Sequence, residues 1–232
     1  FVSQGVELDM VRQGQRGELS CEARAGLRLH YDSIQRDHSE HPYDMVAGEL
    51  QRGEGGRVVR ADSLSSTTAG AAWGLWELTW RRVSLAPGAR IEGVATRVTD
   101  ALAPDADDLT ASRWVALPAL GVGLAASDTV RFEAGVREGF SPVSPGQPDD
   151  VRPERNVTVD GGMRWEGESR SHVAATAYHT RYRNLVGECS FSSGCDAGAV
   201  DTQFNAGAVR VSGLELEGAS RPSVAPRPTP AG

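Results

Sequence analysis

The stretch LSCEARAGLRLHYD, from Leu19 to Asp32, places an apolar or small side chain at every second position. Charged or hydrogen-bonding side chains fill most positions between them, so an extended strand of this sequence has one oily and one charged face. The thirteen residues from Leu19 to Tyr31 reach roughly 40 Å, about twice the length of an ordinary strand. At the roughly 45° tilt of a membrane barrel, this is about 30 Å along the membrane normal. The stretch therefore predicts a strand of an outer-membrane β-barrel.

Composition narrows the class of protein. The 232 residues carry a formal net charge of −7 and give a sequence pI near 5.3, which argues against a nucleic-acid-binding protein. The longest uncharged stretches, 63–76 and 114–127, are too short for a spanning helix. A mean hydropathy of −0.35 does not argue against a membrane barrel, because only alternate residues of its strands face lipid.

Further alternating segments bring the expected number of strands to nine. Their expected ranges include 6–12, 76–81, 90–99, 130–137, 157–165, 172–184 and 208–219, with a bulge at Gly213. Short links (13–17, 83–89, 127–128 and 166–171) alternate with long ones (33–66, 100–111, 138–153 and 187–205). Tight turns at one end and long loops at the other are typical of outer-membrane barrels. A soluble sandwich or propeller gives no reason for this asymmetry.

The cost of charge in lipid predicts the register of the first long strand. An Arg that faces lipid near mid-bilayer costs about 2–4 kcal/mol, so Glu22, Arg24 and Arg28 should face the lumen and Leu27 and Leu29 the lipid. The five tryptophans are candidates for interfacial aromatic belts, with packing in a soluble core as the alternative. They are Trp73, Trp76, Trp80, Trp114 and Trp165.

Cysteine and acidic residues offer few signs of catalysis or metal binding. Cys189 and Cys195 lie six residues apart in a Ser/Gly-rich loop, which favours a local disulfide in an extracytoplasmic compartment and is not a zinc-ligand spacing. The loop side chains of Asp37, His38, Glu40, His41 and Asp44 are interpreted as solvated, with metal ligation as the weaker alternative. The chain contains no nucleophile elbow, P-loop, HExxH or dinucleotide-binding motif, so we expect no enzyme and no cofactor.

A succession of motifs resembles one family. REGFSPVSP (137–145) is followed by Pro153-Glu154, GGMRW (161–165), YRNLVGEC (182–189), FSSGCDAG (191–198) and QFNAGAVRVSGLELEG (203–218). The earlier LRLHYDSIQRDHSEHPYDM (27–45) and PGARIE (87–92) fit the same order. Over residues 1–220 the chain resembles the barrel domain of TonB-dependent outer-membrane receptors, in the ferric-dicitrate and siderophore branch.

The resemblance implies a barrel of twenty-two strands, plugged by an N-terminal domain, that imports a ferric chelate with energy from TonB. We therefore expect about nine strands of an antiparallel, up-and-down transmembrane barrel, incomplete, in a Gram-negative outer membrane. The plug, and with it the contact to TonB, is not among these residues. Residues 221–232 hold four prolines and are expected to form a disordered tail.

An anionic chelate also implies ligand-binding residues near the outer rim, where Arg and hydrogen-bond donors would recognise it. The candidates are Arg137, Gln147, Arg152, Arg181 and Arg183. Phe140 is interpreted mainly as part of a rigid Pro-rich exit from a strand, with ligand contact as the alternative. Two other functions stay open: a passive or differently loaded outer-membrane channel, and a soluble extracytoplasmic β-sandwich or propeller that binds a ligand.

Overall fold

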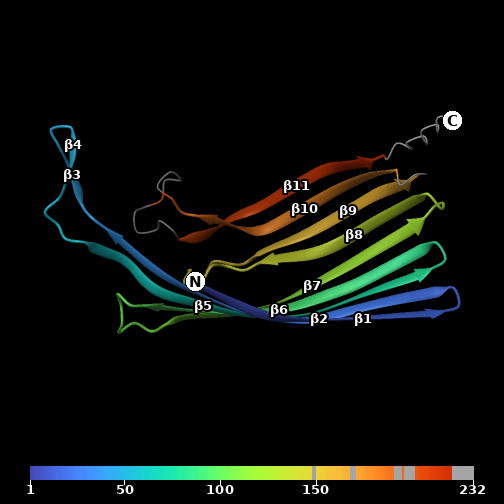
Figure 1. The fold of residues 1–232 in the computed structure, drawn as a ribbon, viewed down its shortest axis with the longest axis horizontal. Helices are drawn as coiled ribbons and strands as arrows, with labels where there is room; N and C mark the ends of the chain where they lie inside the picture. Colours follow the sequence, from blue (N-terminus) through green and yellow to red (C-terminus); the bar gives the residue numbers. More distant parts are fainter. Residues whose placement is uncertain (148–149, 168–170, 191–194, 196–201, 221–232) are drawn as a thin grey trace, which may run out of the picture.

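The computed structural model is one long, curved antiparallel sheet with a small separate hairpin (Figure 1). It describes residues 1–147, 150–167, 171–190, 195 and 202–220. The large sheet contains β1 (Val2–Arg16), β2 (Leu19–Glu40), β5 (Val58–Trp80), β6 (Val83–Asp100), β7 (Leu109–Ala125), β8 (Val130–Ser141), β9 (Glu154–Glu166), β10 (His172–Glu188) and β11 (Gln203–Ala219). The hairpin is β3 (Tyr43–Val46) with β4 (Glu49–Arg52).

Each strand of the large sheet pairs with its sequence neighbours, in the order β1-β2-β5-β6-β7-β8-β9-β10-β11. Nine strands in an up-and-down antiparallel order confirm the expected fold class. The sheet is open within the described residues, with β1 and β11 at its two edges. No helix in the described part of the chain is long and apolar enough to cross a membrane.

The connections alternate between short and long as expected, but the strands are longer than the sequence suggested. The predicted loop 33–66 is mostly strand, because β2 runs on to Glu40, β5 begins at Val58 and the β3–β4 hairpin lies between them. The predicted link 83–89 is the start of β6. Its pairing with β5 is interrupted between the rungs of Leu85 and Gly88, where Pro87 has no N–H to donate. The predicted tail, 221–232, lies outside the described residues.

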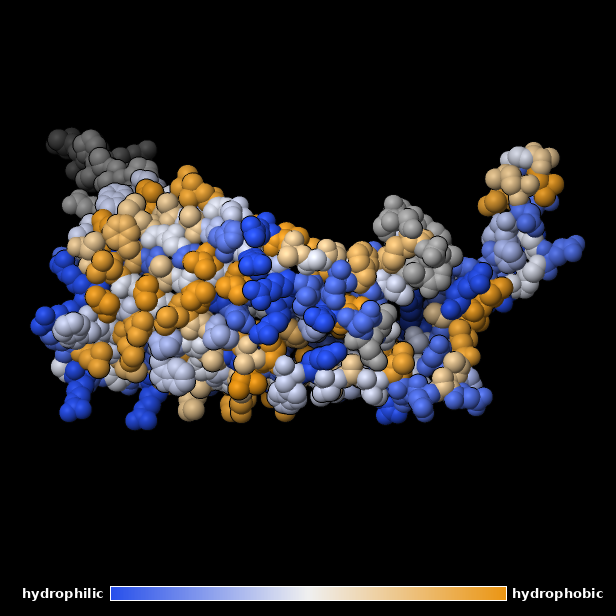
Figure 2. Space-filling view, turned by 180° about the vertical axis from the view of Figure 1, so that it is seen from behind, coloured by the Kyte–Doolittle hydropathy of each residue, from blue (hydrophilic) through white to orange (hydrophobic). Residues whose placement is uncertain are grey.

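The ladder registers sort the side chains onto two chemically different faces. Leu27 and Leu29 share the apolar face of the sheet, and Glu22, Arg24 and Arg28 share the other, polar face. The predicted separation of these residues is therefore confirmed. The apolar face continues across the sheet through Val6, Leu8, Met10, Leu78, Leu85, Ile91, Leu120, Val122, Leu124, Phe132, Val136, Val159, Met163, Val173, Leu214 and Leu216. Figure 2 shows apolar residues gathered toward the end of the sheet that carries the short turns, with a hydrophilic zone farther along the strands.

The polar face is lined by ion pairs rather than by a packed core. Acid and base stand two residues apart on one strand, and so on one face, in Glu22–Arg24, Arg90–Glu92, Arg131–Glu133 and Arg164–Glu166. Across strands, Arg137 pairs with Asp160. The most buried side chains of this face, Thr158 and Thr180, are 7% exposed and share a hydrogen bond of 2.9 Å. Val151 is the only buried apolar residue among those described.

The tryptophans divide between the faces. Trp76, Trp80, Trp114 and Trp165 lie on the apolar face, where an interfacial belt requires them. Trp73 lies on the polar face, so its assignment to a belt is wrong. Its ring lies over Gly26, which has no side chain to obstruct it, and under the Arg90 guanidinium at 5.6 Å from the ring centroid.

The sheet splits between β7 and β8 at its outer end, the end of the long links. Pairing of these strands stops at the rung of Ala119 and Arg137, one residue short of Pro118. β8 continues to Ser141 paired with β9 alone, and β7 from Leu109 to Pro118 pairs with β6 alone. Arg155 crosses the split, since its Nη2 lies 3.5 Å from the Ala116 carbonyl oxygen.

Candidate ligand-binding site

A large groove lies on the polar face at the end of the long links. Its volume is about 1130 Å³. The groove is bounded by the outer ends of β2, β5 and β6 and by parts of the links that follow β6 and β8. Its polar lining includes Arg36, His38, Glu40, Arg60, Ser63, Ser65, Asp100, Asp107, Ser144, Gln147 and Thr202. This mixture of cations, carboxylates and hydroxyls suits a ligand that offers both acceptors and donors.

The acidic residues that the sequence places in the first long loop are held by cations. Arg60 donates to Glu40 at 2.8 Å, and His38 lies 3.2 Å from the same carboxylate. These two hydrogen bonds, with that of Arg60 the larger effect, lower the pKa of Glu40 below its ordinary value. Arg57 donates to Asp37 at 3.2 Å. Among the described residues, no group of three or more His, Cys, Asp or Glu is arranged to hold a metal ion.

The link between β6 and β7 is tied back to β6 by its last residue. Asp108 accepts hydrogen bonds from the Thr99 hydroxyl and from Arg97, and these lower the pKa of its carboxyl group. The ionised form is therefore favoured, and it fastens the link beside the groove, which Asp107 lines.

The link between β8 and β9 reaches across the polar face to β11. Its Ser144 N–H donates to the Gln203 side-chain oxygen at 3.1 Å, and the Gln203 amide donates back to Ser144 Oγ at 3.0 Å. Gln147 accepts from the Gln203 N–H. The Asn205 side chain bonds both the N–H and the carbonyl of Arg152, each at 2.8 Å. We call these contacts the β11 clamp. It holds Gln147 and the backbone of Arg152 in fixed positions.

A small cavity of about 60 Å³ lies under the same link. Phe140, Pro142, Val143 and Val151 line one side of it, and Val94, Thr96, Ala111 and Arg113 of the polar face line the other. Phe140 reaches this cavity because β8 has left β7 three residues earlier, at Arg137. Its surroundings fit the structural role that the sequence favoured.

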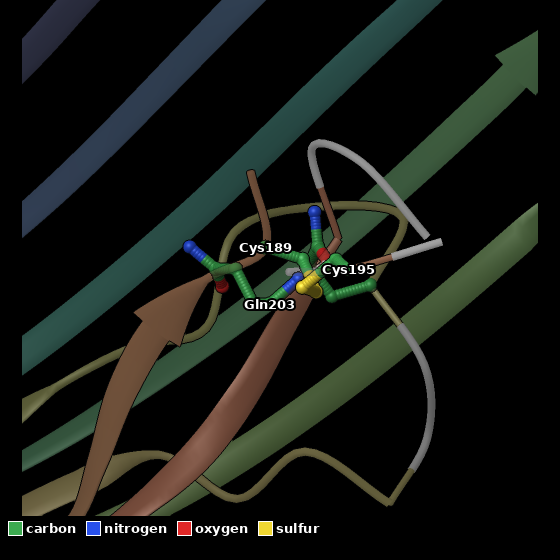
Figure 3. The surroundings of a disulfide bond; sticks show 4 residues. Cys189, Cys195 and Gln203 are labelled. Atoms are coloured by element: carbon green, nitrogen blue, oxygen red, sulfur yellow. Dashed lines mark hydrogen bonds between the residues drawn. A yellow bond between two sulfur atoms is a disulfide. The ribbon is translucent and has the colours of Figure 1, made fainter. Parts of the chain in front are cut away.

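The disulfide lies next to the clamp (Figure 3). Cys189 and Cys195 are joined with their Cα atoms 5.8 Å apart, and the Cys189 N–H donates to the Thr202 carbonyl at 2.8 Å. Thr202 lines the groove and precedes Gln203, so the cross-link stands at the start of β11. Cys21 is a free thiol on the apolar face of β2.

The sequence candidates do not all share one face. Arg137 lies on the polar face in its pair with Asp160, and Gln147 lines the groove. Arg181 and Arg183 have the parity of Val157 and Val159, so they lie on the other face of the sheet. Arg36 and Arg60 line the groove but were not among the candidates. The sequence prediction misses them because it assigns residues 33–66, and with them Arg36 and Arg60, to a long loop.

Several solved structures share this fold. The ferric citrate transporter FecA, in the unliganded form, has 21% sequence identity and a TM-score of 0.69, over 93% of this chain and 31% of its own. The siderophore receptor PiuA from Acinetobacter baumannii has 14% identity and a TM-score of 0.69, over 92% of this chain and 35% of its own. The copper transporter OprC has 13% identity and a TM-score of 0.61, over 92% and 34%.

This chain thus spans about a third of the length of those structures. A comparison with curated proteins found no match. The family model described as TonB dependent receptor-like, beta-barrel, matches residues 4–225. The chain therefore belongs to the TonB-dependent receptor β-barrel family of Gram-negative outer-membrane proteins.

Proposed function

We propose that the protein to which this chain belongs imports a ferric chelate, either ferric citrate or a siderophore complex, across the outer membrane with energy from TonB. The observation that carries the proposal is the groove on the polar face at the outer end of the strands, where a ligand from outside would first bind. FecA and PiuA, which share the fold, are described as a ferric citrate transporter and a siderophore receptor. The family is one of receptors and transporters, and we propose no enzymatic activity.

Within the groove, we propose that the ligand contacts residues from the link between β8 and β9 and from the ends of β2 and β5. Gln147 lines the groove, and Arg152 is exposed and belongs to the same clamped link. Arg60, on the facing wall, carries a guanidinium group suited to a carboxylate or catecholate oxygen. Arg137 lies lower on the polar face, where a ligand that has passed the rim would meet it. Phe140 contributes by supporting the link.

Uptake of radiolabelled iron tests the proposal in cells that depend on this receptor under iron limitation. Two substitutions in the groove, Arg60→Ala and Gln147→Ala, should raise the concentration of ferric chelate needed for half-maximal uptake. The matched control is Arg164→Ala, on the polar face near the short turns, which should leave that concentration unchanged. Ferric citrate and siderophore complexes are tested separately to identify the ligand.

Three results contradict the proposal. Uptake of copper without uptake of either iron chelate would make the protein a copper transporter, as OprC is described. Iron uptake that continues after the loss of TonB would indicate a passive channel. Equal effects of the groove and control substitutions would place the ligand elsewhere.

A further inference from the structure

Four arginines gather on the apolar face of β9, β10 and β11, beyond the zone of aliphatic side chains. They are Arg155, Arg181, Arg183 and Arg210, and we call them the outer arginine cluster. Arg181 stands directly opposite Arg210, and Arg183 directly opposite Arg155. Cα atoms opposite each other in a ladder are about 4.5–5.5 Å apart, and the two rungs lie two residues apart on β10. The four guanidinium groups can therefore reach one ligand.

Like charges directly opposite each other destabilise a sheet unless something neutralises them. Within the described residues, Arg155 has a carboxylate partner, Glu138 at 2.8 Å, but no ion pair connects Arg181, Arg183 or Arg210 to an acid. A second Arg–Arg rung, Arg131 opposite Arg164 on the polar face, is different. There each arginine has its own glutamate two residues away, at 3.8 Å and 2.9 Å. The outer arginine cluster thus carries positive charge that the described chain does not neutralise.

The height of the cluster places it where the hydrocarbon of the membrane ends. Arg181 is nine residues beyond His172, the start of β10 at the short turns, which is roughly 30 Å along the strand. At a tilt of about 45° this is roughly 21 Å along the normal, close to the outer edge of an apolar band about 25 Å tall. Arg183 and Arg155 are one step farther out.

The split between β7 and β8 begins on the line of paired residues that leads to Arg181. If the register of β7 and β8 continued by one rung, Pro118 would stand opposite Glu138. Glu138 pairs with Val157 of β9, and Val157 pairs with Arg181 of β10. From that rung outward, β7 and β8 form no ladder hydrogen bonds with each other, and hydrocarbon does not tolerate backbone groups without hydrogen-bond partners. The strand length and the split together place Arg181 near the outer edge of the apolar band, next to the headgroup layer.

From this geometry we propose that the outer arginine cluster is a binding site for a phosphate-bearing lipid headgroup of the outer leaflet. Guanidinium groups at a membrane surface bind phosphates through paired hydrogen bonds and attract anionic headgroups electrostatically. The apolar side chains below the cluster, such as Val159, Val173 and Leu214, would contact the acyl chains of the same lipid. This site is separate from the groove and does not depend on the identity of the imported ligand.

Native mass spectrometry of the whole receptor, extracted from outer membranes in detergent, tests the site. The probe is bisphosphorylated lipid A, titrated onto delipidated protein, with phosphatidylcholine and inorganic phosphate as separate arms. The double substitution Arg181→Gln with Arg210→Gln should weaken lipid A binding by about 30-fold, if each arginine contributes as a basic residue at a membrane surface does. Arg181→Lys with Arg210→Lys keeps the charge and should retain most of the binding.

The matched control is Arg131→Gln with Arg164→Gln, the Arg–Arg rung on the polar face, which should bind lipid A as the wild type does. Every variant is measured only on the fraction that shows heat-modifiable gel migration, so misfolded protein does not count. Equal loss in the control, or unchanged binding in the Gln variant, would overturn the proposal. Binding of inorganic phosphate as tight as that of lipid A would show a free-anion site instead. Equal binding of phosphatidylcholine, whose phosphate is neutralised by its choline, would show that the net negative charge of the headgroup is not recognised.

Discussion

Replacing Leu120 by Arg should impair assembly of the barrel strongly, because Leu120 is near the middle of the membrane. It lies on the apolar face five residues from Ala125, the end of β7 at the short turns. Five residues are roughly 16 Å along the strand and roughly 12 Å along the normal, half the height of the apolar band. An arginine there costs about 2–4 kcal/mol, which lowers the ratio of folded to unfolded protein by a factor of roughly 30 to 1000.

Two comparisons make this test quantitative. Leu27 is eight residues from the start of β2, roughly 19 Å along the normal, so Leu27→Arg should cost less than Leu120→Arg. Arg28→Leu removes only an exposed contact to Glu7 at 4.0 Å, worth about 0–1 kcal/mol. Urea titration of the whole receptor in lipid vesicles, followed by heat-modifiable gel migration, measures all three. If Arg28→Leu proved as harmful as Leu120→Arg, the two faces would have been assigned to the wrong environments.

Three further predictions concern the polar face and the links. Gly26→Val should destabilise the protein by about 1–3 kcal/mol in urea titration and shift the tryptophan fluorescence, because a side chain at Gly26 would overlap the Trp73 ring; an unchanged spectrum would contradict this packing. Because the pKa of Glu40 is lowered in the fold, its ion pair with Arg60 should be intact above the ordinary carboxyl range and lost as pH falls below it. The protection of amides at the end of β2 against hydrogen exchange, measured relative to the intrinsic exchange rate at each pH, should therefore fall between roughly pH 5 and pH 3, but not in Arg60→Gln, which has already lost the contact. Gln203→Ala should speed proteolysis of residues 142–153 without changing barrel assembly, and equal cleavage of wild type and variant would show that the β11 clamp does not hold the link.

Much of the fold could be predicted because the rule of alternation acts locally. A side chain that faces lipid has to be apolar whatever the partner strand is. The pattern from Leu19 to Tyr31 therefore predicts, without knowledge of the partner, which of its side chains face lipid. The turns likewise follow local chemistry, as at Gly17, which has a positive φ of 62° between β1 and β2. Nine strands, their order and the separation of Leu27 from Arg28 all came from these local signals.

Strand ends and the site were harder, because alternation stops carrying information where the strand leaves lipid. From Ser33 to Glu40 both faces of β2 meet water, so the sequence loses its pattern although the hydrogen-bonded ladder continues. Trp73 is of the residue type that forms interfacial belts, and only its pairing opposite Gly26 places it on the polar face. The parity of Arg181 with Val157 could have revealed an outward-facing arginine. Its nearness to the loop after β10 instead groups it with the ligand-binding candidates.

If the protein imports a charged cargo as proposed above, the glutamate–arginine pairs spaced two residues apart along the polar face would affect how that cargo moves past them. A positive and a negative group side by side form a small dipole, whose field fades within roughly the distance that separates the two charges. An ion drifting past such a lining would encounter shallow, alternating wells, and none deep enough to trap it. Permeation requires this balance, since a passage that grips its cargo tightly cannot release it on the far side. We therefore expect selectivity for the ligand to reside at the entrance, and the wall below it to bind the cargo only weakly.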